Sequence, residues 1–461
     1  MHTRMLLFIL LLLLSVSLAA QDHSFTNAVS DSLCVKRDTV PRKKHFWRAA
    51  GELLLVELIP WSENRFIRKA DFAKVNFASI GHNLKPSSWE WDDNNFSTNQ
   101  FAHPYHGNLY YSAFRSNGYS FWQSVPAAFA GSFLWEVAGE THNPAPNDFI
   151  NTSLGGIALG EMTYRISNKI VNNGARGVKR QVQEVLALIV NPMNGLNRII
   201  NGQWGRVYGD TDSCNELSGM INVGVRRFGL RDLYGKYNGK NELYFRLRLY
   251  YGDKYQESNI PFQSFYAQVE AGGGDSAYLN NVQVAGALKT WKMKEDSSQL
   301  HLYSVTMNYD YLKNSAFEYG GQSFTFKLLS NWRRKKDFKI FTEIGSGVVV
   351  LGAVPDKYLF YGEGRNYDYG PGLLVSGNAV FNFHDIVEAE LSYKGNRFQT
   401  VNGNKSSYII NTYFAELRGK LFKRLSLVAG VGQFTLNGYF KDFRNVSQRY
   451  PFFRVSAGYI F

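Results

Sequence analysis

The chain has very few cysteines, since only Cys34 and Cys214 occur among its 461 residues. A scaffold built from several disulfides is therefore excluded, and so is a zinc site made from a cluster of cysteines and histidines. The two cysteines could pair in an oxidising compartment. Such a bond would tie the N-terminal segment to a linker and would not organise a fold.

Common catalytic signatures are also missing. The sequence has no HExxH zinc motif, no GxSxG nucleophile turn, no GxxxxGK[ST] phosphate loop and no GxGxxG between a strand and a helix. No cofactor is expected, and the identity of any metal stays unknown. The formal net charge is +13. This charge favours attraction to anionic surfaces but does not identify a binding site.

The N-terminus carries an apolar run that predicts export. Arg4 precedes "MLLFILLLLLSVSLAA", which ends in small residues before Gln21. The run is shorter than the roughly 20 residues that a spanning helix needs, so residues 1–20 are predicted to be a secretory signal peptide. Residues 21–45 are expected to be a flexible segment. Export favours anionic lipid over nucleic acid as a partner.

The C-terminal half, residues 219–461, has a hydrophobic period of two. In "ELYFRLRLYY", Leu243, Leu247 and Leu249 fall on one face, and Arg246 and Arg248 on the other. An apolar face opposite a charged face, in long strands, is typical of a transmembrane barrel, which must close because lipid offers no partner to an open edge. Twelve strands are predicted, at 219–228, 241–251, 262–272, 280–292, 299–311, 315–330, 338–350, 371–383, 387–398, 406–420, 424–439 and 448–461.

The connectors and the last strand support a bacterial outer-membrane barrel. The turns at 384–385 and 422–424 are tight, whereas the loops at 229–240, 353–370 and 440–447 are long. The final "YPFFRVSAGYIF" resembles the C-terminal signature that the outer-membrane assembly machinery reads. We therefore expect contacts with outer-membrane lipids and with that machinery. The inward charges could line a pore or fill the lumen as ion pairs.

Residues 46–205 have a helical period instead, so the fold class is α+β, with a helical unit before the barrel. Helices are predicted over "FWRAAGELLLVELI", ending at Pro60, over "GYSFWQSVPAAFAGSFLWEVAGE", over "DFINTSLGGIALGEMTYRISNKI", opened by Asp148 as N-cap, and over "VKRQVQEVLALIV". Gly156 and Gly160 would give the third helix a smooth face for another backbone. The alternative is that these glycines are merely weak helical positions.

One stretch resembles a known family. "WEWDDNNFSTNQFAHPYHGNLYYSAFRSNGYSFW", followed by "GSFLWEVAGETHNPAPNDFINTSLGGIALGE", is similar to the core motif of an uncharacterised family of Gram-negative envelope proteins, known only as a domain of unknown function. The resemblance covers residues 88 to about 205. It implies an envelope location, with the helical unit in the periplasm or inside the barrel, and it implies no activity.

The same stretch concentrates the candidate site residues. Glu136 and Glu140 are four apart and predicted to share a helix face, so they need a cation, an arginine or a shared proton between them. The turn-rich segment 103–118 supplies the nearby candidates, and Pro104 leaves open whether its two histidines share a face. The candidate catalytic residues are His103, His106, Glu136, Glu140 and Asp148, and the candidate ligand or network residues are Asn108, Arg115, Asn117, Trp135, Asn151 and Glu161.

Two structural explanations and two functions stay open. Arg115, Glu136, Glu140 and Asp148 could form a buried network that fixes the helices, or calcium could bind the carboxylates. In the first function, the helical unit plugs or gates the lumen, or binds an envelope lipid or a small solute. In the second, the chain is a lipid- or glycan-directed hydrolase with His103 or His106 as base and Glu140 or Asp148 as the acid that orients it.

Overall fold

The computed structural model describes residues 43–208, 216–231, 237–239, 241–273, 278–314, 318–335 and 337–461. The predicted signal peptide, nearly all of segment 21–45 and both cysteines lie outside these ranges. The chain divides into two compact units. The helical unit comprises Met1–Asp92, Ala102–Leu217 and Phe461, and the barrel unit comprises Asp93–Phe101 and Ser218–Ile460.

Helices account for most of the described part of the helical unit. Four of the described helical segments are π-helices, namely η2 (Glu63–Arg68), η5 (Thr98–Ala102), η6 (Trp135–Gly139) and η7 (Asn151–Gly155). The α-helices are α2 (Phe46–Ser62), α3 (Phe77–Asn83), α4 (His103–Ser116), α5 (Phe121–Leu134), α6 (Pro146–Ile150), α7 (Gly156–Val171), α8 (Gly177–Val190) and α9 (Pro192–Ile200), with short 3-10 turns at η3 (Asp71–Ala73) and η4 (Pro86–Ser88). Among the described residues, no helix is long and apolar enough to cross a membrane.

The prediction that the first helix ends at Pro60 is wrong, because α2 continues to Ser62. A proline inside a helix lacks an N–H and leaves the carbonyl four residues earlier without its usual donor. Here that carbonyl belongs to Val56, and His106 Nε2 lies 3.2 Å from it. The imidazole therefore replaces the missing backbone donor and allows the helix to pass through the proline.

Segment 103–118 is mostly helix rather than turn. It forms α4, with Pro104 in the first turn, where a missing N–H costs nothing. His103 and His106 consequently stand three residues apart on one helix face. The predicted N-cap role of Asp148 is also wrong, since the N-cap of α6 is Ala145 and Asp148 lies in its first turn.

The predicted smooth face at Gly156 and Gly160 is confirmed as a close crossing of α4 and α7. A Cβ at Gly156 would lie 2.4 Å from the Gly107 carbonyl carbon, and a Cβ at Gly107 would lie 1.8 Å from the Thr152 carbonyl oxygen. A Cβ at Gly160 would meet the Tyr111 ring at 2.6 Å. Glycine is required at this crossing because the two backbones are in contact.

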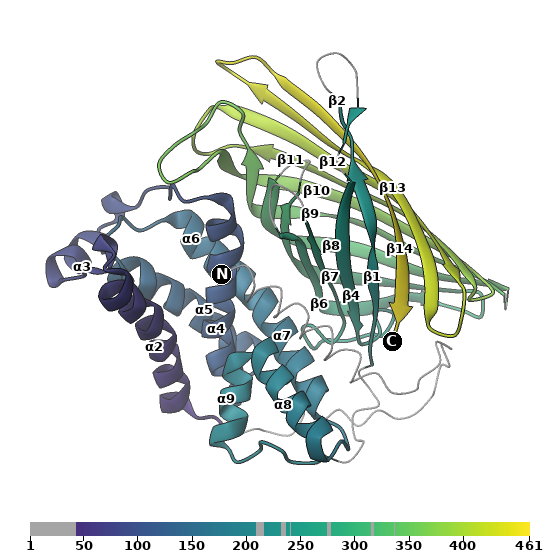
Figure 1. Cartoon of the computed structure of the whole chain (residues 1–461), viewed down its shortest axis with the longest axis horizontal. Coiled ribbons are helices and arrows are strands. Elements are labelled where there is room, and N and C mark those ends of the chain that lie inside the picture. The colour runs from purple at the N-terminus through teal and green to yellow at the C-terminus, as the bar shows by residue number, and fades with distance from the viewer. Residues whose placement is uncertain are drawn as a thin grey trace. The chain divides into compact units, whose positions relative to one another are not determined.

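The barrel unit forms a closed antiparallel barrel of twelve strands within its described residues, in which each strand pairs with its neighbours in sequence and β1 pairs with β14 (Figure 1). All twelve predicted strands are present. They are β1 (Leu217–Phe228), β4 (Asn241–Tyr251), β5 (Phe265–Gly272), β6 (Leu279–Glu295), β7 (Gln299–Lys313), β8 (Glu318–Lys335), β9 (Phe338–Pro355), β10 (Tyr367–Phe383), β11 (Val387–Gln399), β12 (Ser406–Lys420), β13 (Leu425–Phe440) and β14 (Val446–Ile460), and a small hairpin, β2 (Leu230–Arg231) with β3 (Tyr237–Asn238), sits in the first long loop.

The predicted division into apolar and charged faces is confirmed by the register. Arg246 of β4 reaches Glu416 of β12 at 2.7 Å, and because these strands are not neighbours, the pair must cross the lumen. The positions of opposite parity therefore point outward. Large apolar side chains are exposed there, including Val223, Val225, Leu243, Leu373, Leu417, Val431 and Val455.

Most connectors sort by end as predicted. Residues 296–298, 384–386 and 421–424 make tight turns at one end, which we call the short-turn end, and the longer connectors 356–366 and 441–445 lie at the other, the long-loop end. The connector 252–264 is an exception, because it is long and lies at the short-turn end. Its Phe262 is fully buried and its Tyr255 packs against Leu300, Leu302 and Leu329.

A segment from the N-terminal half, Asp93–Phe101, packs on the outside of the barrel, and we call it the outer strap. Asp310 of β7 pairs with Lys394 of β11 across the lumen at 2.6 Å, so Tyr309 and Tyr311 on either side of it point outward. Tyr309 donates a hydrogen bond of 2.5 Å to the Gln100 carbonyl. The other contacts of the strap are Asn99 Nδ2 to Tyr367 Oη at 2.9 Å, Gln100 Nε2 to Tyr369 Oη at 3.2 Å, and Phe96 stacked on Tyr311.

Candidate functional site

A cluster of carboxyl and imidazole groups is buried in the helical unit, and we call it the acid–histidine cluster. It consists of Glu57 of α2, Asp92, His103 and His106 of α4, Glu136 of η6, and Glu140 and Asp148. Five of its members are the predicted catalytic residues, which the fold therefore brings together. Of the side chains, Glu136, Asp148 and Glu57 are at most 7% exposed.

The two imidazoles have different surroundings. His106 lies between the rings of Tyr110 and Trp135, at centroid distances of 4.6 and 5.3 Å, and its Nε2 serves the Val56 carbonyl. Burial lowers its pKa to about 4, so the ring is neutral at physiological pH. His103 Nε2 lies 3.6 Å from Asp148 Oδ2, and burial also lowers its pKa.

The carboxyl groups are held close together in a dry environment. Burial, and next the neighbouring Glu140, raise the pKa of Glu136 well above its usual range, and burial with Asp92 raises the pKa of Glu140 to about 8. The pKa of Asp148 is also raised, first by burial. Burial likewise raises the pKa of Glu57 to about 8. Glu57 and Glu140 therefore hold protons at neutral pH, because burial makes their anions unfavourable.

Few neutral donors serve these carboxyl groups. Glu136 Oε2 accepts from the Ala145 backbone N–H at 2.7 Å, and Asp148 Oδ1 accepts from Asn147 Nδ2 at 2.7 Å. Glu57 is 7% exposed, and its hydrogen-bonding neighbour is Tyr110, whose hydroxyl acts against the effect of burial on the Glu57 pKa. Within the described helical unit, no lysine or arginine pairs with Glu57, Glu136, Glu140 or Asp148.

Local π-helical geometry shapes the cluster. Glu136 lies in η6, and Glu140 caps that segment rather than continuing a regular helix with Glu136. Asn83 Nδ2 holds the end of this segment by donating to the carbonyls of Glu136, Glu140 and His142 at 3.1 to 3.3 Å. π-Helical turns are rare and recur at functional sites. The predicted shared α-helical face of the two glutamates is therefore wrong, although the carboxyl groups do lie together.

Arg115 does not join the acid–histidine cluster. It pairs with Glu161 through Nε at 2.7 Å and NH2 at 3.2 Å, and Arg165 and Tyr111 donate to the same carboxylate at 2.8 and 2.7 Å. Glu161 is fully buried, and burial alone would raise its pKa. The charges of Arg115 and Arg165 outweigh burial, so the pKa of Glu161 is lowered. The predicted network of Arg115 with Glu136, Glu140 and Asp148 is thus replaced by a separate network around Glu161.

The candidate asparagines stabilise helix packing. Asn108 Oδ1 accepts from Ser112 and Thr163 at 3.2 and 3.0 Å, which links α4 to α7. Asn117 Nδ2 donates to Glu52 Oε2 at 2.9 Å, which links the end of α4 to α2. Asn151 is fully buried in η7. Among the candidate network residues, Trp135 contacts the acid–histidine cluster through the ring of His106.

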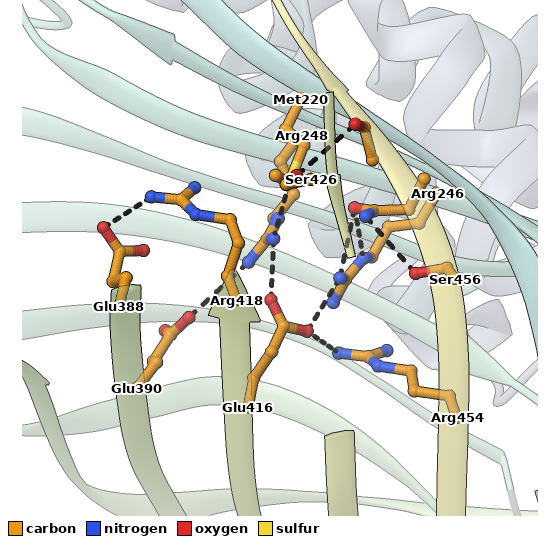
Figure 2. Close-up of polar contacts among 12 residues, drawn as sticks. Met220, Arg246, Arg248, Glu388, Glu390, Glu416, Arg418, Ser426, Arg454 and Ser456 are labelled. Carbon is orange, nitrogen blue, oxygen red and sulfur yellow. Dashed lines mark hydrogen bonds and ion pairs between the residues drawn. The ribbon is translucent and has the colours of Figure 1, made fainter. Parts of the chain in front are cut away.

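A second polar constellation fills the barrel lumen, as Figure 2 shows. Glu416 accepts from Arg246 and Arg248, each at 2.7 Å, and from Arg454 at 3.2 Å. Beside this centre, Arg418 pairs with Glu388 at 2.6 Å. Of the two possibilities for the inward charges, ion pairing across the lumen is the one observed.

An apolar layer crosses the same lumen nearer the long-loop end. It consists of inward-facing side chains from eight strands, and it includes Tyr319, Val349, Leu374, Phe398, Tyr408, Ile410, Phe434, Leu436 and Phe440. Its members on β12 share the parity of Glu416 and lie toward the opposite end of that strand. The ion-paired layer and the apolar layer thus place the barrel's own side chains inside the lumen at two levels along the strands.

Sequence reasoning missed several members of these sites. Glu57 was missed because it lies in the apolar run "ELLLVELI", although an acid among leucines is itself a signal of a paired or perturbed carboxyl. Asp92 lies far from Glu136 in sequence, and no local pattern connects them. In the described part of the chain, no three histidine, cysteine, aspartate or glutamate side chains are arranged to hold a metal ion.

Comparison with known proteins identifies part of the chain. No curated protein matches it. Among solved structures, the NanC porin has 12% identity and a TM-score of 0.31, covering 51% of this chain and 98% of its own. The KdgM porin has 12% identity and a TM-score of 0.26, covering 52% and 99%, and the outer-membrane channel DcaP of Acinetobacter baumannii has 8% identity and a TM-score of 0.26, covering 54% and 97%.

These structural likenesses are low, and the topology above stands without them. The family comparison concerns the helical unit and the outer strap. A family model described as "Domain of unknown function (DUF3943)" matches residues 88–193, which include the quoted motif and all of the acid–histidine cluster except Glu57. The chain therefore carries a DUF3943 domain at residues 88–193, ahead of a closed twelve-strand β-barrel.

Proposed function

We propose that this protein is an outer-membrane barrel with a sealed lumen and that its helical unit binds a cationic group at the acid–histidine cluster. The cation would be an ammonium group, carried by a small solute or by the headgroup of an envelope lipid. The helical unit is proposed to lie in the periplasm. Because the barrel's own side chains close its lumen, the proposal assigns no plugging role to the helical unit.

The outward face of the barrel supports the membrane location. Apolar side chains such as Leu243 and Val431 are 73% and 59% exposed, and exposed apolar surface on strand after strand is unfavourable in water. In lipid the same side chains are well solvated, and closure leaves no open edge. Assembly in the outer membrane would proceed through the C-terminal strand β14, whose outward row includes Phe453 and Val455.

The observation that carries the binding function is the unmatched acidity of the acid–histidine cluster. Glu57, Glu136, Glu140 and Asp148 share one buried region, and no lysine or arginine of the described helical unit neutralises them. Bringing carboxyl groups together in a dry site is costly unless a cation or protons compensate. An ammonium group would supply that charge, and the rings of Trp135 and Tyr110 nearby would contact its alkyl part.

A hydrolase is not proposed. The imidazole N–H of His106 donates to the Val56 carbonyl, which lacks a backbone donor because of Pro60. This structural hydrogen bond explains the position of the ring without a catalytic role. His103 lies near Asp148 at 3.6 Å, which is longer than a hydrogen bond. No comparison with known proteins supports hydrolytic activity either.

Proton release tests the proposal directly. At neutral pH the carboxyl groups of Glu57 and Glu140 hold protons, and a bound cation would favour their anions. Calorimetric titration of the full chain with ethanolamine, repeated in buffers of different ionisation enthalpy, should show proton release into the buffer. Phosphatidylethanolamine vesicles in place of ethanolamine distinguish a lipid headgroup from a free solute.

Matched variants complete the test. Glu140→Gln should abolish both the binding heat and the proton release, whereas Glu63→Gln, at an exposed position of η2, should leave them unchanged. If Glu140→Gln instead leaves binding intact, the cluster is not the site. If no ammonium compound binds the folded wild-type protein, the binding function is refuted, and the barrel assignment is not affected.

A further inference from the structure

The barrel unit has a cavity at the long-loop end, which we call the rim pocket. Its volume is about 220 Å³. It lies among the start of connector 356–366, the ends of β12 and β13 and the beginning of β14. Its walls include Asp356, Asn366, Tyr408, Leu436, Phe440 and Val446.

The floor of the rim pocket is the apolar layer of the lumen. Tyr408, Leu436 and Phe440 belong both to that layer and to the pocket wall. A molecule that enters from the long-loop end therefore stops there and cannot pass through the barrel. The pocket has the properties of a binding site rather than of a channel entrance.

The Tyr408 hydroxyl lies at the polar side of the pocket. Tyr408 is 1% exposed, and its Oη has Ser406, Asp356 and Asp368 as neighbours but makes no bond that meets hydrogen-bond geometry. Near it, Asp356 Oδ2 accepts from Asn404 Nδ2 at 2.7 Å and Oδ1 accepts from the Tyr358 N–H at 2.8 Å. A buried hydroxyl that makes no hydrogen bond is unfavourable, so a ligand that bonds to it gains affinity.

The rim of the pocket is held by contacts between loops. Tyr358 donates to the Arg444 carbonyl at 2.9 Å, and its ring stacks on Phe443 at a centroid distance of 4.7 Å. It also meets the edge of Phe440 at 5.0 Å. These contacts join connector 356–366 to connector 441–445. The pocket is thus preformed, and a ligand would not have to order the loops.

Side chains of both charge signs lie at or beside the pocket. Asp356 and Lys357 line it. Asp368 is fully buried nearby, and Arg365 Nη2 lies 3.7 Å from its Oδ1.

We infer that the rim pocket binds a small molecule that carries one ring and one hydroxyl group. An apolar cavity of about 150 Å³ holds one benzene molecule, so the observed volume suits one ring with a substituent. Leu436, Phe440 and Val446 would contact the ring, and Tyr408 Oη would bond to the hydroxyl. This site lies in the barrel unit and goes beyond the proposed cation binding in the helical unit.

Phenol is the probe for the experiment. The full chain is reconstituted in lipid nanodiscs, and binding is followed by saturation-transfer NMR with increasing phenol. Phenol should bind saturably. Tyr408→Phe keeps the ring and removes the hydroxyl, so it should weaken phenol binding about tenfold. Benzene, which has no hydroxyl, should bind wild type and Tyr408→Phe equally.

A pair of matched enlargements separates the pocket from the membrane. Val446→Phe places a larger side chain in the pocket and should abolish saturable binding, whereas Val431→Phe, on the outward face, should not change it. Heat-shifted electrophoretic mobility verifies that each variant barrel is folded. Equal phenol uptake by all variants, or uptake that never saturates, would show only partition into lipid and would overturn the inference.

Discussion

At the residue scale, some buried carboxyl groups pair with arginines and others do not. In the lumen, Glu416 is matched by three arginines, and in the helical unit Glu161 is matched by two. In the acid–histidine cluster, the carboxyl groups of Glu57, Glu136, Glu140 and Asp148 pair with no lysine or arginine of the described helical unit. A fully paired network stabilises one arrangement, whereas an unmatched group is available for a ligand or a proton.

Glu416→Ala should be strongly destabilising. It would leave Arg246, Arg248 and Arg454 buried without their common acceptor, and breaking a buried pair costs about 3–5 kcal/mol. Glu388→Ala is the control, because the side chains of Glu388 and Arg418 are each 25% exposed and solvent screens their interaction. Urea unfolding in detergent micelles measures both. Equal losses of unfolding free energy in the two variants would contradict the role of Glu416 as the centre of the lumen network.

The stability of the helical unit should fall as pH rises between 6.5 and 8. The folded pKa values of Glu57 and Glu140 are raised to about 8, so the folded state binds more protons than the unfolded chain up to that pH, and its free energy of unfolding decreases with pH. His106, with its pKa lowered to about 4, acts in the opposite direction between pH 4 and 6.5 and has no effect above that range.

Thermal melting of the full chain, followed through its helical circular dichroism, tests this dependence. Glu140→Gln should reduce the fall between pH 6.5 and 8, because an amide does not titrate. A melting temperature that increases over this range would show that the carboxyl groups are ionised in the folded protein, contrary to the account.

At the scale of elements, the helical unit depends on one close crossing. Gly156→Ala would put a Cβ 2.4 Å from the Gly107 backbone, so α4 and α7 must separate, and overpacking of this kind costs about 1–3 kcal/mol or more. Gly51→Ala in α2 meets nothing within 4 Å and should be stabilising by up to about 1 kcal/mol. Melting of the two variants compares them, and a neutral Gly156→Ala would refute the crossing.

Strands were far easier to predict from the sequence than helix details. Alternation along "ELYFRLRLYY" fixes both the strand and its faces, because each residue has only two orientations relative to the sheet. The helix end predicted at Pro60 was wrong, because the donor that replaces the Pro60 N–H is His106, a residue distant in sequence. Pro104 left open whether His103 and His106 share a helix face. The outer strap was not predicted either, since its partners Tyr309 and Tyr367 lie more than 200 residues away.

The candidate site could be predicted as a set of residues but not as an arrangement. His103, His106, Glu136, Glu140 and Asp148 do converge, because the motif spans helices that pack together. The possible network of Arg115 with Glu136, Glu140 and Asp148 is not formed, because Arg115 pairs with Glu161. A sequence shows which charged residues exist but not which of them pair. Glu57 enters the cluster only through the packing of α2 on α4.

At the scale of the whole molecule, one chain combines a closed twelve-strand barrel with a helical unit that contains the acid–histidine cluster. The outward apolar face belongs in lipid, while the lumen is occupied by the ion-paired layer and the apolar layer. The account therefore predicts that the protein needs detergent for solubility. A monodisperse sample in plain buffer would contradict the membrane location.

The most direct test of the sealed barrel is conductance across a planar lipid bilayer. Insertion is first verified by flotation of the protein with lipid vesicles and by its heat-shifted electrophoretic mobility. The account predicts that bilayers containing the wild-type protein show no steady current above that of lipid alone. Long-lived, ohmic current steps from the inserted wild-type protein would contradict it.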